Sequence, residues 1–225
     1  MRRLHFLVAL LLLCTRQTIS FCAPSPSHRY PSQSSMKGCV YIATTLDGYL
    51  ASEDGDVSFL DAFREGGPAP DDFFGFQNFL DSVDAIVMGR KTFEKVVSFG
   101  PTMWPYGSIP LVVWTRDATY TIPTHLESSV SVSNQSPLDL METMDSKGYQ
   151  RVYLDGGVTI QSFLLADLVD EMILSRLPVL LGSGIPLFAS GGGETARTLE
   201  HLQTKSYPNG IVTSHYRVPP RVASS

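Results

Sequence analysis

The amino-acid sequence predicts an α/β fold, with a central, mostly parallel sheet, flanking helices and an antiparallel hairpin at the C-terminal end. Short apolar runs alternate with amphipathic segments through most of the chain, a pattern typical of strand–helix units. Two of these runs end in glycine directly before an amphipathic segment, at Gly89 and at Gly156. Near the C-terminus, Pro208, Asn209 and Gly210 separate two further runs, which is a hairpin signal.

The strands are predicted from runs of β-branched, aliphatic and aromatic residues. Residues 39–45 form the first run, which ends before Gly48, and the run at residues 172–177 stops at Pro178. Strands are further predicted at residues 85–88, 111–115, 129–132 and 152–154, and residues 199–218 hold the two strands of the hairpin. A chain that places strands and helices in turn builds a parallel sheet.

Four helices are predicted from the spacing of their apolar residues, at residues 73–82, 92–98, 138–147 and 158–165. Asp71 or Asp72 would cap the first helix. Its residues predicted to face the core are Phe73, Phe76 and Leu80. Gly148 ends the third helix, because glycine readily adopts the left-handed conformation that follows a helix.

Three segments organise the chain: a presequence at residues 1–36, one domain at residues 37–220 and a tail at residues 221–225. Arginines precede a short apolar run at residues 6–14, and a Ser- and Pro-rich stretch follows, with no acidic residue before Asp47. This pattern indicates a signal segment joined to a transit peptide, and the junction at residues 19–24 resembles that of bipartite plastid presequences. Plastid import is therefore expected. Secretion, or cytoplasmic synthesis from Met36, stays the alternative.

Charge and composition exclude several classes of protein. The net charge is −5 and no long basic run occurs, which argues against a nucleic-acid partner. The three cysteines form no CxxC pair and the five histidines are scattered, so no metal site is expected. No membrane segment is expected after the presequence. The partner is expected to be a small-molecule substrate, and a homodimer stays open.

The segment from Gly89 to Thr92 has the composition of a phosphate-binding turn. Free N–H groups at a helix start attract anions. Glycine allows close backbone approach, Thr92 offers a hydroxyl, and Arg90 and Lys91 offer positive charge. The spacing is not that of a P-loop. A plain helix start with solvated charges is the alternative.

A second turn of this kind follows the strand at residues 152–154, where Gly156 and Gly157 open a helix. Two such turns in one domain suggest a ligand with several phosphates, such as a dinucleotide, although the sequence lacks the GxGxxG of a Rossmann fold. Thr115 and Arg116 end another strand, and Arg116 could bind a ribose 2′-phosphate, which would favour NADPH over NADH. A surface role for Arg116 is the alternative.

Four segments in this order resemble the dihydrofolate-reductase-like superfamily. They are residues 39–50 (CVYIATTLDGYL), 86–94 (IVMGRKTFE), 170–188 (DEMILSRLPVLLGSGIPLF) and 204–212 (TKSYPNGIV). The nearest branch is the C-terminal reductase domain of the bifunctional riboflavin-biosynthesis deaminase-reductase, in a stand-alone form. The chain has no zinc-deaminase motif of the His-x-Glu and Pro-Cys-x-x-Cys kind.

The resemblance implies an NADPH-dependent reductase with a dihydrofolate-reductase-like sheet and assigns cofactor contacts. Ala43 would contact the nicotinamide carboxamide. The residues implied to bind the cofactor phosphates after the second strand are Gly89, Arg90, Lys91 and Thr92. Thr115 and Arg116 would lie near the adenosine ribose. The residues implied to hold the pyrophosphate and open the following helix are Gly156, Gly157, Val158 and Thr159.

Asp47 and Asp72 are the candidate catalytic proton donors. A turn former is the alternative for Asp47, and a helix cap is the alternative for Asp72. Dihydrofolate reductases carry a substrate-binding carboxylate on the inward face of the first helix, where this chain has Phe73 and Phe76, which disfavours dihydrofolate.

Three functions follow from these observations. The first is a reductase of the riboflavin-pathway type, resembling 5-amino-6-(5-phosphoribosylamino)uracil reductase. The second is a reductase of dihydrofolate, a pterin or another small molecule. The third is an NADPH-binding protein without catalysis. The riboflavin-pathway substrate carries a phosphate that needs cations of its own, for which the sequence offers isolated candidates in Arg64 and Lys95.

Overall fold

The computed structural model describes residues 36–63, 73–188 and 196–221. The presequence before Met36 lies outside these residues, as do Arg64, Asp71 and Asp72. Within the described residues, no helix is both long enough and apolar enough to cross a bilayer. The same residues contain no group of three or more Cys, His, Asp or Glu side chains that could hold a metal ion.

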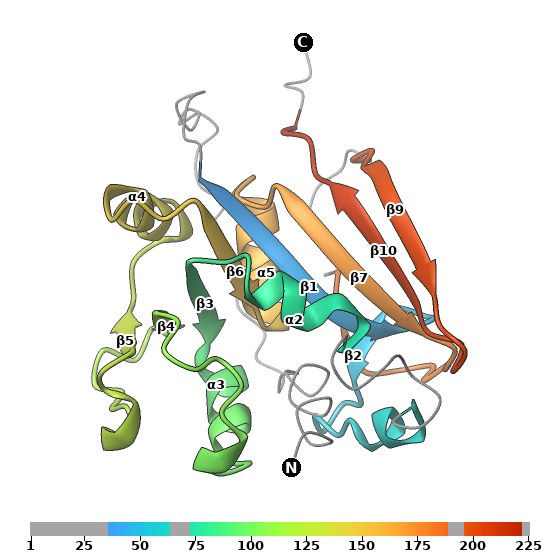
Figure 1. The fold of residues 1–225 in the computed structure, drawn as a ribbon, viewed down its shortest axis with the longest axis horizontal. Coiled ribbons are helices and arrows are strands. Elements are labelled where there is room, and N and C mark those ends of the chain that lie inside the picture. Colours follow the sequence, from blue (N-terminus) through green and yellow to red (C-terminus); the bar gives the residue numbers. More distant parts are fainter. Residues whose placement is uncertain (1–35, 64–72, 189–195, 222–225) are drawn as a thin grey trace.

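Eight strands form one sheet in the order β5-β4-β3-β6-β1-β7-β10-β9 (Figure 1). Their bounds are β1 Lys37–Thr45, β3 Ala85–Gly89, β4 Leu111–Trp114, β5 Val130–Ser133, β6 Arg151–Asp155, β7 Glu171–Leu177, β9 Glu200–Ser206 and β10 Val212–Arg217. The pairs from β5 to β7 are all parallel, and β10 lies antiparallel to both β7 and β9. The predicted fold class, a mostly parallel sheet with a C-terminal antiparallel hairpin, is confirmed.

Helices cover both faces of the sheet (Figure 1). They are α2 Phe76–Leu80, α3 Arg90–Val97, α4 Pro137–Ser146 and α5 Gly157–Leu165. The short 3-10 helices are η2 Ser58–Phe63, η3 Phe73–Gly75, η4 Pro101–Met103 and η5 Thr124–Leu126. Apolar residues of α2 and α3 pack in one core cluster with Tyr41 and Tyr153, whereas those of α4 and α5 pack in another with Ile42 and Leu154. The alternation along β1 and β6 explains this division, because successive side chains of a strand point to opposite faces.

The first helix differs from the prediction, which placed it at residues 73–82 with Phe73 in its first turn. The regular helix α2 starts at Phe76, since Phe74 and Gly75 both have positive φ angles of 59° and 91°. A left-handed aromatic residue is unfavourable unless its surroundings hold it. The Tyr41 hydroxyl donates to the Phe74 carbonyl at 2.6 Å, and the Phe74 ring packs edge-on against Tyr207. These long-range contacts override the local helical pattern.

A second, two-stranded sheet was not predicted. It joins β2 Tyr49–Ala51 to β8 Ile185–Pro186 in antiparallel fashion. Both strands are shorter than the runs from which strands are usually recognised. The pairing links the turn after β1 to the segment after β7, so two distant parts of the chain meet beyond the same edge of the main sheet.

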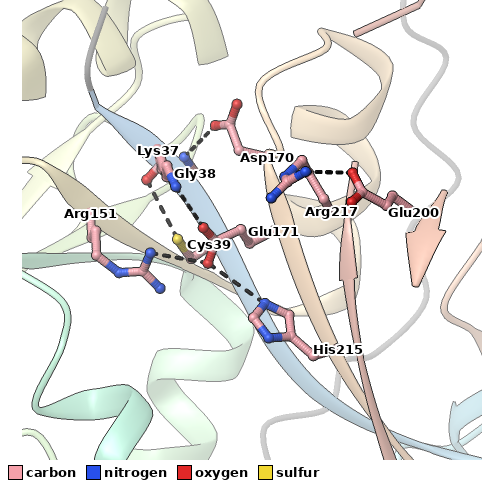
Figure 2. A network of polar contacts seen from close by, with 9 residues as sticks. All are labelled: Lys37, Gly38, Cys39, Arg151, Asp170, Glu171, Glu200, His215 and Arg217. Carbon is pink, nitrogen blue, oxygen red and sulfur yellow. Dashed lines mark hydrogen bonds and ion pairs between the residues drawn. The ribbon is translucent and has the colours of Figure 1, made fainter. Parts of the chain in front are cut away.

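Charged residues tie four strands together near the amino ends of the parallel strands, as Figure 2 shows. Glu171 on β7 accepts hydrogen bonds from Lys37 Nζ at 2.8 Å and Arg151 Nη1 at 3.0 Å, and His215 Nε2 lies 3.7 Å away. Burial alone would raise the pKa of Glu171, but Lys37 and Arg151 hold it below its usual value. This network clamps β1, β6, β7 and β10 at one edge and leaves the opposite edge for the loops that follow the strands.

Gly38 in β1 offers a test of how tightly this edge is packed. A Cβ atom there would lie 2.0 Å from the Leu168 carbonyl oxygen, and the Gly38 N–H donates to Asp170 at 2.8 Å. We expect Gly38→Ala to lower the free energy of unfolding by roughly 3 kcal/mol, because a backbone atom cannot move aside cheaply. Chemical denaturation measures this loss.

Gly148→Ala is the matched control. Gly148 has a φ of +81° but open space around its Cβ position, so only backbone strain of about 1 kcal/mol is expected. Equal losses for the two variants would contradict the steric explanation for Gly38.

Candidate functional site

Two loops of the same form lie side by side at the carboxyl ends of β3 and β6. Each reads Gly-x-x-Thr, from Gly89 to Thr92 and from Gly156 to Thr159. The strands are parallel neighbours, with Met88 paired to Asp155, so the two glycines follow matched positions. Each glycine precedes the first residue of its helix, and neither helix start has a side-chain cap. Two sets of helix N–H groups therefore open at one place, which favours the binding of an anion.

The two loops pack into one another through glycine and threonine. A Cβ atom on Gly156 would lie 2.5 Å from Thr92 Oγ1, and one on Gly89 would lie 2.9 Å from Thr159 Oγ1. Each threonine thus fills the space that a side chain on the other loop's glycine would need. These glycines are predicted from the sequence to allow close approach of a ligand, but the contact between the loops already requires them.

The hydroxyl groups of this contact are buried. Thr92 is 3 % exposed and Thr159 is 1 % exposed. Thr159 Oγ1 has no hydrogen-bond partner among the described residues. A buried hydroxyl without a partner costs free energy, so such groups are concentrated where a ligand or water completes them. The orphaned hydroxyl fits a site whose bonding is completed by a bound group.

Arg90, at the start of α3, contacts two acidic side chains and one aromatic ring. Arg90 Nη1 lies 3.5 Å from Asp117 Oδ2, its Nε lies 3.9 Å from Glu94 Oε1, and its guanidinium lies 5.7 Å from the centre of the Tyr120 ring. The Thr119 hydroxyl and backbone N–H, followed by Arg90, hold the pKa of Asp117 below its usual value. These three contacts orient the Arg90 guanidinium beside the first loop.

The predicted cofactor residues come from four adjacent strands, β4, β3, β6 and β1. Thr115 and Arg116 directly follow Trp114, which pairs with Gly89, so they reach the same edge as Arg90 and Lys91. Gly157, Val158 and Thr159 form the first turn of α5. Ala43 is buried on β1, two residues before the strand ends, and pairs with Ser175 of β7. The residues are thus gathered at one edge, and their contacts with a cofactor stay predictions.

Asp47, a candidate proton donor, anchors a loop in this structure. Its carboxylate accepts hydrogen bonds from the Thr45 hydroxyl at 2.5 Å and from the Leu181 and Gly182 N–H groups at 3.0 and 2.8 Å. The Thr45 hydroxyl and then the Gly182 N–H lower the pKa of Asp47. A carboxylate held in the ionised form is a weak acid catalyst near neutral pH. These contacts favour the alternative interpretation of Asp47 as a turn former, while Asp72, the other candidate, lies outside the described residues.

One acidic residue of the site, Asp155, was not predicted as a site residue from the sequence. Asp155, the last residue of β6, is fully buried, and its Oδ1 accepts from the Gly156 N–H at 2.8 Å. Burial raises the pKa of Asp155 to about 8, although the Gly156 N–H and the nearby hydroxyls of Tyr153 and Tyr106 act in the opposite direction. The signal available in the sequence was a carboxylate at the end of an apolar run, directly before the glycine pair.

Segments beyond the carboxyl ends of β1 and β7 contact one another, since the Leu46 N–H donates to the Val179 carbonyl at 2.9 Å. The turn between β9 and β10 contacts the loop after β2, since Asn209 Nδ2 donates to the Phe63 carbonyl at 3.1 Å. Lys205 lies with its ammonium 4.9 Å from the centre of the Tyr207 ring. Lys95 on α3, predicted as an isolated cation, lies with its ammonium 5.8 Å from the centre of the Phe99 ring.

The contact between the two loops can be tested with a double-mutant cycle. Gly156→Ala should lower the free energy of unfolding by roughly 3 kcal/mol, because the new methyl group meets Thr92 Oγ1 and the φ of 96° strains alanine. In a Thr92→Ala background the added loss should fall by about half, since the obstructing oxygen is gone. Chemical denaturation of the four proteins measures the coupling, and strictly additive losses would show that the loops do not touch.

Comparison with known proteins agrees with this geometry. The profile of the RibD C-terminal domain matches residues 37–213. An uncharacterised protein of Bacillus subtilis (strain 168), YwjB, is 30 % identical over 182 residues, which cover 80 % of this chain and 98 % of the relative. A second uncharacterised protein of the same organism, YyaP, is 26 % identical over 186 residues, 78 % of this chain and 91 % of the relative.

Solved structures share the fold. A protein of Shewanella sp. PV-4, provisionally described as a riboflavin biosynthesis protein, has a TM-score of 0.71 and 34 % identity, covering 82 % of this chain and 99 % of that one. The Thermotoga maritima diaminohydroxyphosphoribosylaminopyrimidine deaminase/5-amino-6-(5-phosphoribosylamino)uracil reductase has a TM-score of 0.60 and 14 % identity, covering 82 % of this chain and 57 % of that one. With two glycine-bearing loops at the carboxyl edge of a dihydrofolate-reductase-like sheet, the chain belongs to the RibD C-terminal domain family, a family of reductase domains.

Proposed function

We propose that this protein is an NADPH-dependent reductase of the riboflavin-pathway type, acting on 5-amino-6-(5-phosphoribosylamino)uracil. The observation that carries the proposal is the pair of uncapped helix starts, packed together on β3 and β6, in a member of the RibD C-terminal domain family. The substrate is taken from the reductase name of the Thermotoga maritima protein, whose fold this chain shares.

The residues of the site fit a dinucleotide with charged phosphates. The N–H groups at the starts of α3 and α5 would bind the pyrophosphate, and the orphaned Thr159 hydroxyl would gain a partner there. Lys91 would add positive charge at the first loop, and Arg116, beside the end of β4, would bind the 2′-phosphate of NADPH. Ala43 would hold the nicotinamide end through its backbone, close to the end of β1.

NADPH, when bound, supplies the hydride of the reduction. The residues of this chain contribute by holding the two reactants in place, because orientation accounts for much of the rate of such a step. The loop after β2, which Asn209 joins to the turn between β9 and β10, would help to exclude water from the substrate. The substrate phosphate would need a cation, for which Lys95 and Arg64 are the candidates from the sequence.

Purified protein should oxidise NADPH in the presence of the pyrimidine substrate and should leave dihydrofolate largely unreduced. The described helix α2 has the sequence FQNFL and carries no acidic side chain for a pterin ring. The absorbance of reduced nicotinamide follows both reactions. Turnover of dihydrofolate alone would favour the pterin reductase, and tight NADPH binding without turnover of either compound would favour a non-catalytic role.

Arg116→Ala should weaken NADPH binding about tenfold or more and should leave NADH binding nearly unchanged, because only NADPH carries the 2′-phosphate. Titration calorimetry with both cofactors measures the difference. Arg217→Ala is a matched control, since Arg217 is paired with Glu200 on the hairpin, away from the two loops. Equal loss of both cofactors in Arg116→Ala would remove Arg116 from the 2′-phosphate site.

A further inference from the structure

Asp155 is the only acidic residue of the described chain that is buried from solvent. It ends β6 directly before Gly156, where the second loop starts, and pairs with Met88, which directly precedes the first loop. A buried carboxylate normally has a cation or several hydrogen-bond donors around it, because its charge is costly to remove from water. Asp155 has neither a cation nor several well-formed hydrogen bonds among the described residues.

The carboxyl group has few partners. Oδ1 accepts from the Gly156 N–H at 2.8 Å, and Oδ2 has no hydrogen-bond partner among the described residues. The nearby Tyr106 hydroxyl is also buried and makes no well-formed hydrogen bond, although it is close enough to lower the pKa of Asp155. The Tyr153 hydroxyl donates to the Tyr41 carbonyl at 3.0 Å. No Lys, Arg or His of the described residues forms an ion pair with Asp155.

These contacts suit a carboxylic acid better than a carboxylate. A protonated Asp155 keeps one oxygen as acceptor for Gly156 and offers its O–H to the oxygen of Tyr106, so that both orphaned groups are satisfied. Burial, which raises the pKa of Asp155 to about 8, acts in the same direction. At neutral pH the group below Gly156 would carry a proton and no charge.

We propose that Asp155 is a positioning residue for the cofactor, which holds the Gly156 turn as an uncharged acid and weakens phosphate binding when it ionises. The role rests on the proposed function. A negative charge below the N–H groups of Gly156 and Gly157 would oppose the anion that they bind, whereas the neutral acid leaves their positive field intact. NADPH binding should therefore decline as the pH rises past the ionisation of Asp155.

The other titratable groups that face Asp155 are tyrosines. Tyr106 reaches it from the loop before β4, Tyr153 lies on β6, and Tyr41 on β1 acts through Tyr153. Burial, followed by the nearby Asp155, raises the pKa of both Tyr106 and Tyr153 well above the usual value. They stay neutral over the range in which Asp155 ionises, so a change of cofactor affinity near pH 8 has one source in this cluster.

The test is titration calorimetry with NADPH between about pH 7 and about pH 9.5. Wild-type affinity should fall about tenfold around pH 8. Asp155→Asn keeps an oxygen for Gly156 and cannot ionise, so it should bind within about threefold of wild type at neutral pH and show no decline. Asp155→Ala, without an acceptor for Gly156, should bind more weakly at every pH. Asp170→Asn is the matched control, because Asp170 also accepts a backbone N–H, from Gly38, at the opposite edge of the sheet.

Thermal unfolding without cofactor gives a second readout. The unfolded Asp155 ionises near pH 4 and the folded one near pH 8, so the folded state binds the extra proton between these values. Wild-type stability from this group is full below about pH 4, falls as the pH rises to about 8 and then levels off. As the pH rises across this window, the melting temperature of Asp155→Asn should increase relative to that of wild type.

The outcomes separate this role from the proposed function. A pH profile of Asp155→Asn that follows wild type, or a wild-type affinity that does not change with pH, overturns the role of Asp155 alone. No NADPH binding to wild type at any pH overturns the proposed function and the role together. Should Asp155→Asn not fold, Tyr106→Phe provides the test. Once Asp155 ionises, the Tyr106 hydroxyl turns to donate to the carboxylate, and this charge-assisted contact outweighs the one it makes with the acid, so its loss should move the midpoint of the decline to higher pH.

Discussion

The contact between the two Gly-x-x-Thr loops is the constraint on which the rest of the site depends. Thr92 occupies the space beside Gly156, and Thr159 occupies the space beside Gly89. Each loop can adopt its position only because the other lacks a Cβ atom at the point of contact. This packing brings the starts of α3 and α5 together at adjacent strand ends, so that the N–H groups of two helix starts open at one place, as the proposed binding of a dinucleotide requires.

The polar contacts at the amino ends of the parallel strands differ from those at their carboxyl ends. At the amino ends of the parallel strands, Glu171 and its cationic partners join β1, β6, β7 and β10 (Figure 2). At the carboxyl ends, polar groups with incomplete hydrogen bonding gather at Thr159, Asp155 and Tyr106. Arg151 Nε and His215 Nε2 at the amino ends also lack hydrogen-bond partners, but both side chains lie in ion pairs with Glu171, whereas the orphaned groups at the carboxyl ends can be completed by a ligand. The same parallel arrangement places open α/β binding sites at this end of the strands in general.

Asp155 shows how a residue can serve such a site without reaching solvent. Its carboxyl group accepts the Gly156 N–H, and in the proposed role the backbone of the turn, not the Asp155 side chain, would face the phosphate. A neutral acid in this place contributes a hydrogen-bond acceptor without adding negative charge under a phosphate. Asp47, by contrast, is an ionised carboxylate that holds the turn after β1 to the segment after β7. The pKa values of two acidic residues at one edge thus shift in opposite directions, because Asp155 is buried among tyrosines and Asp47 is surrounded by N–H and O–H donors.

The amino-acid sequence by itself determined the fold class, the two glycine turns and the C-terminal hairpin, because strand and helix patterns and glycine positions are local properties of the chain. That residues from Ala43 to Thr159 serve one cofactor was implied by the family resemblance alone, because the order of the strands β4-β3-β6-β1 is set by tertiary contacts and not by a local pattern. Only the tertiary structure decided that α2 starts at Phe76, since a hydrogen bond from distant Tyr41 and packing with Tyr207 hold Phe74 in a left-handed conformation. It alone placed each threonine against the other loop's glycine and buried Asp155 among tyrosines, because contacts between segments far apart in sequence leave no local pattern to detect.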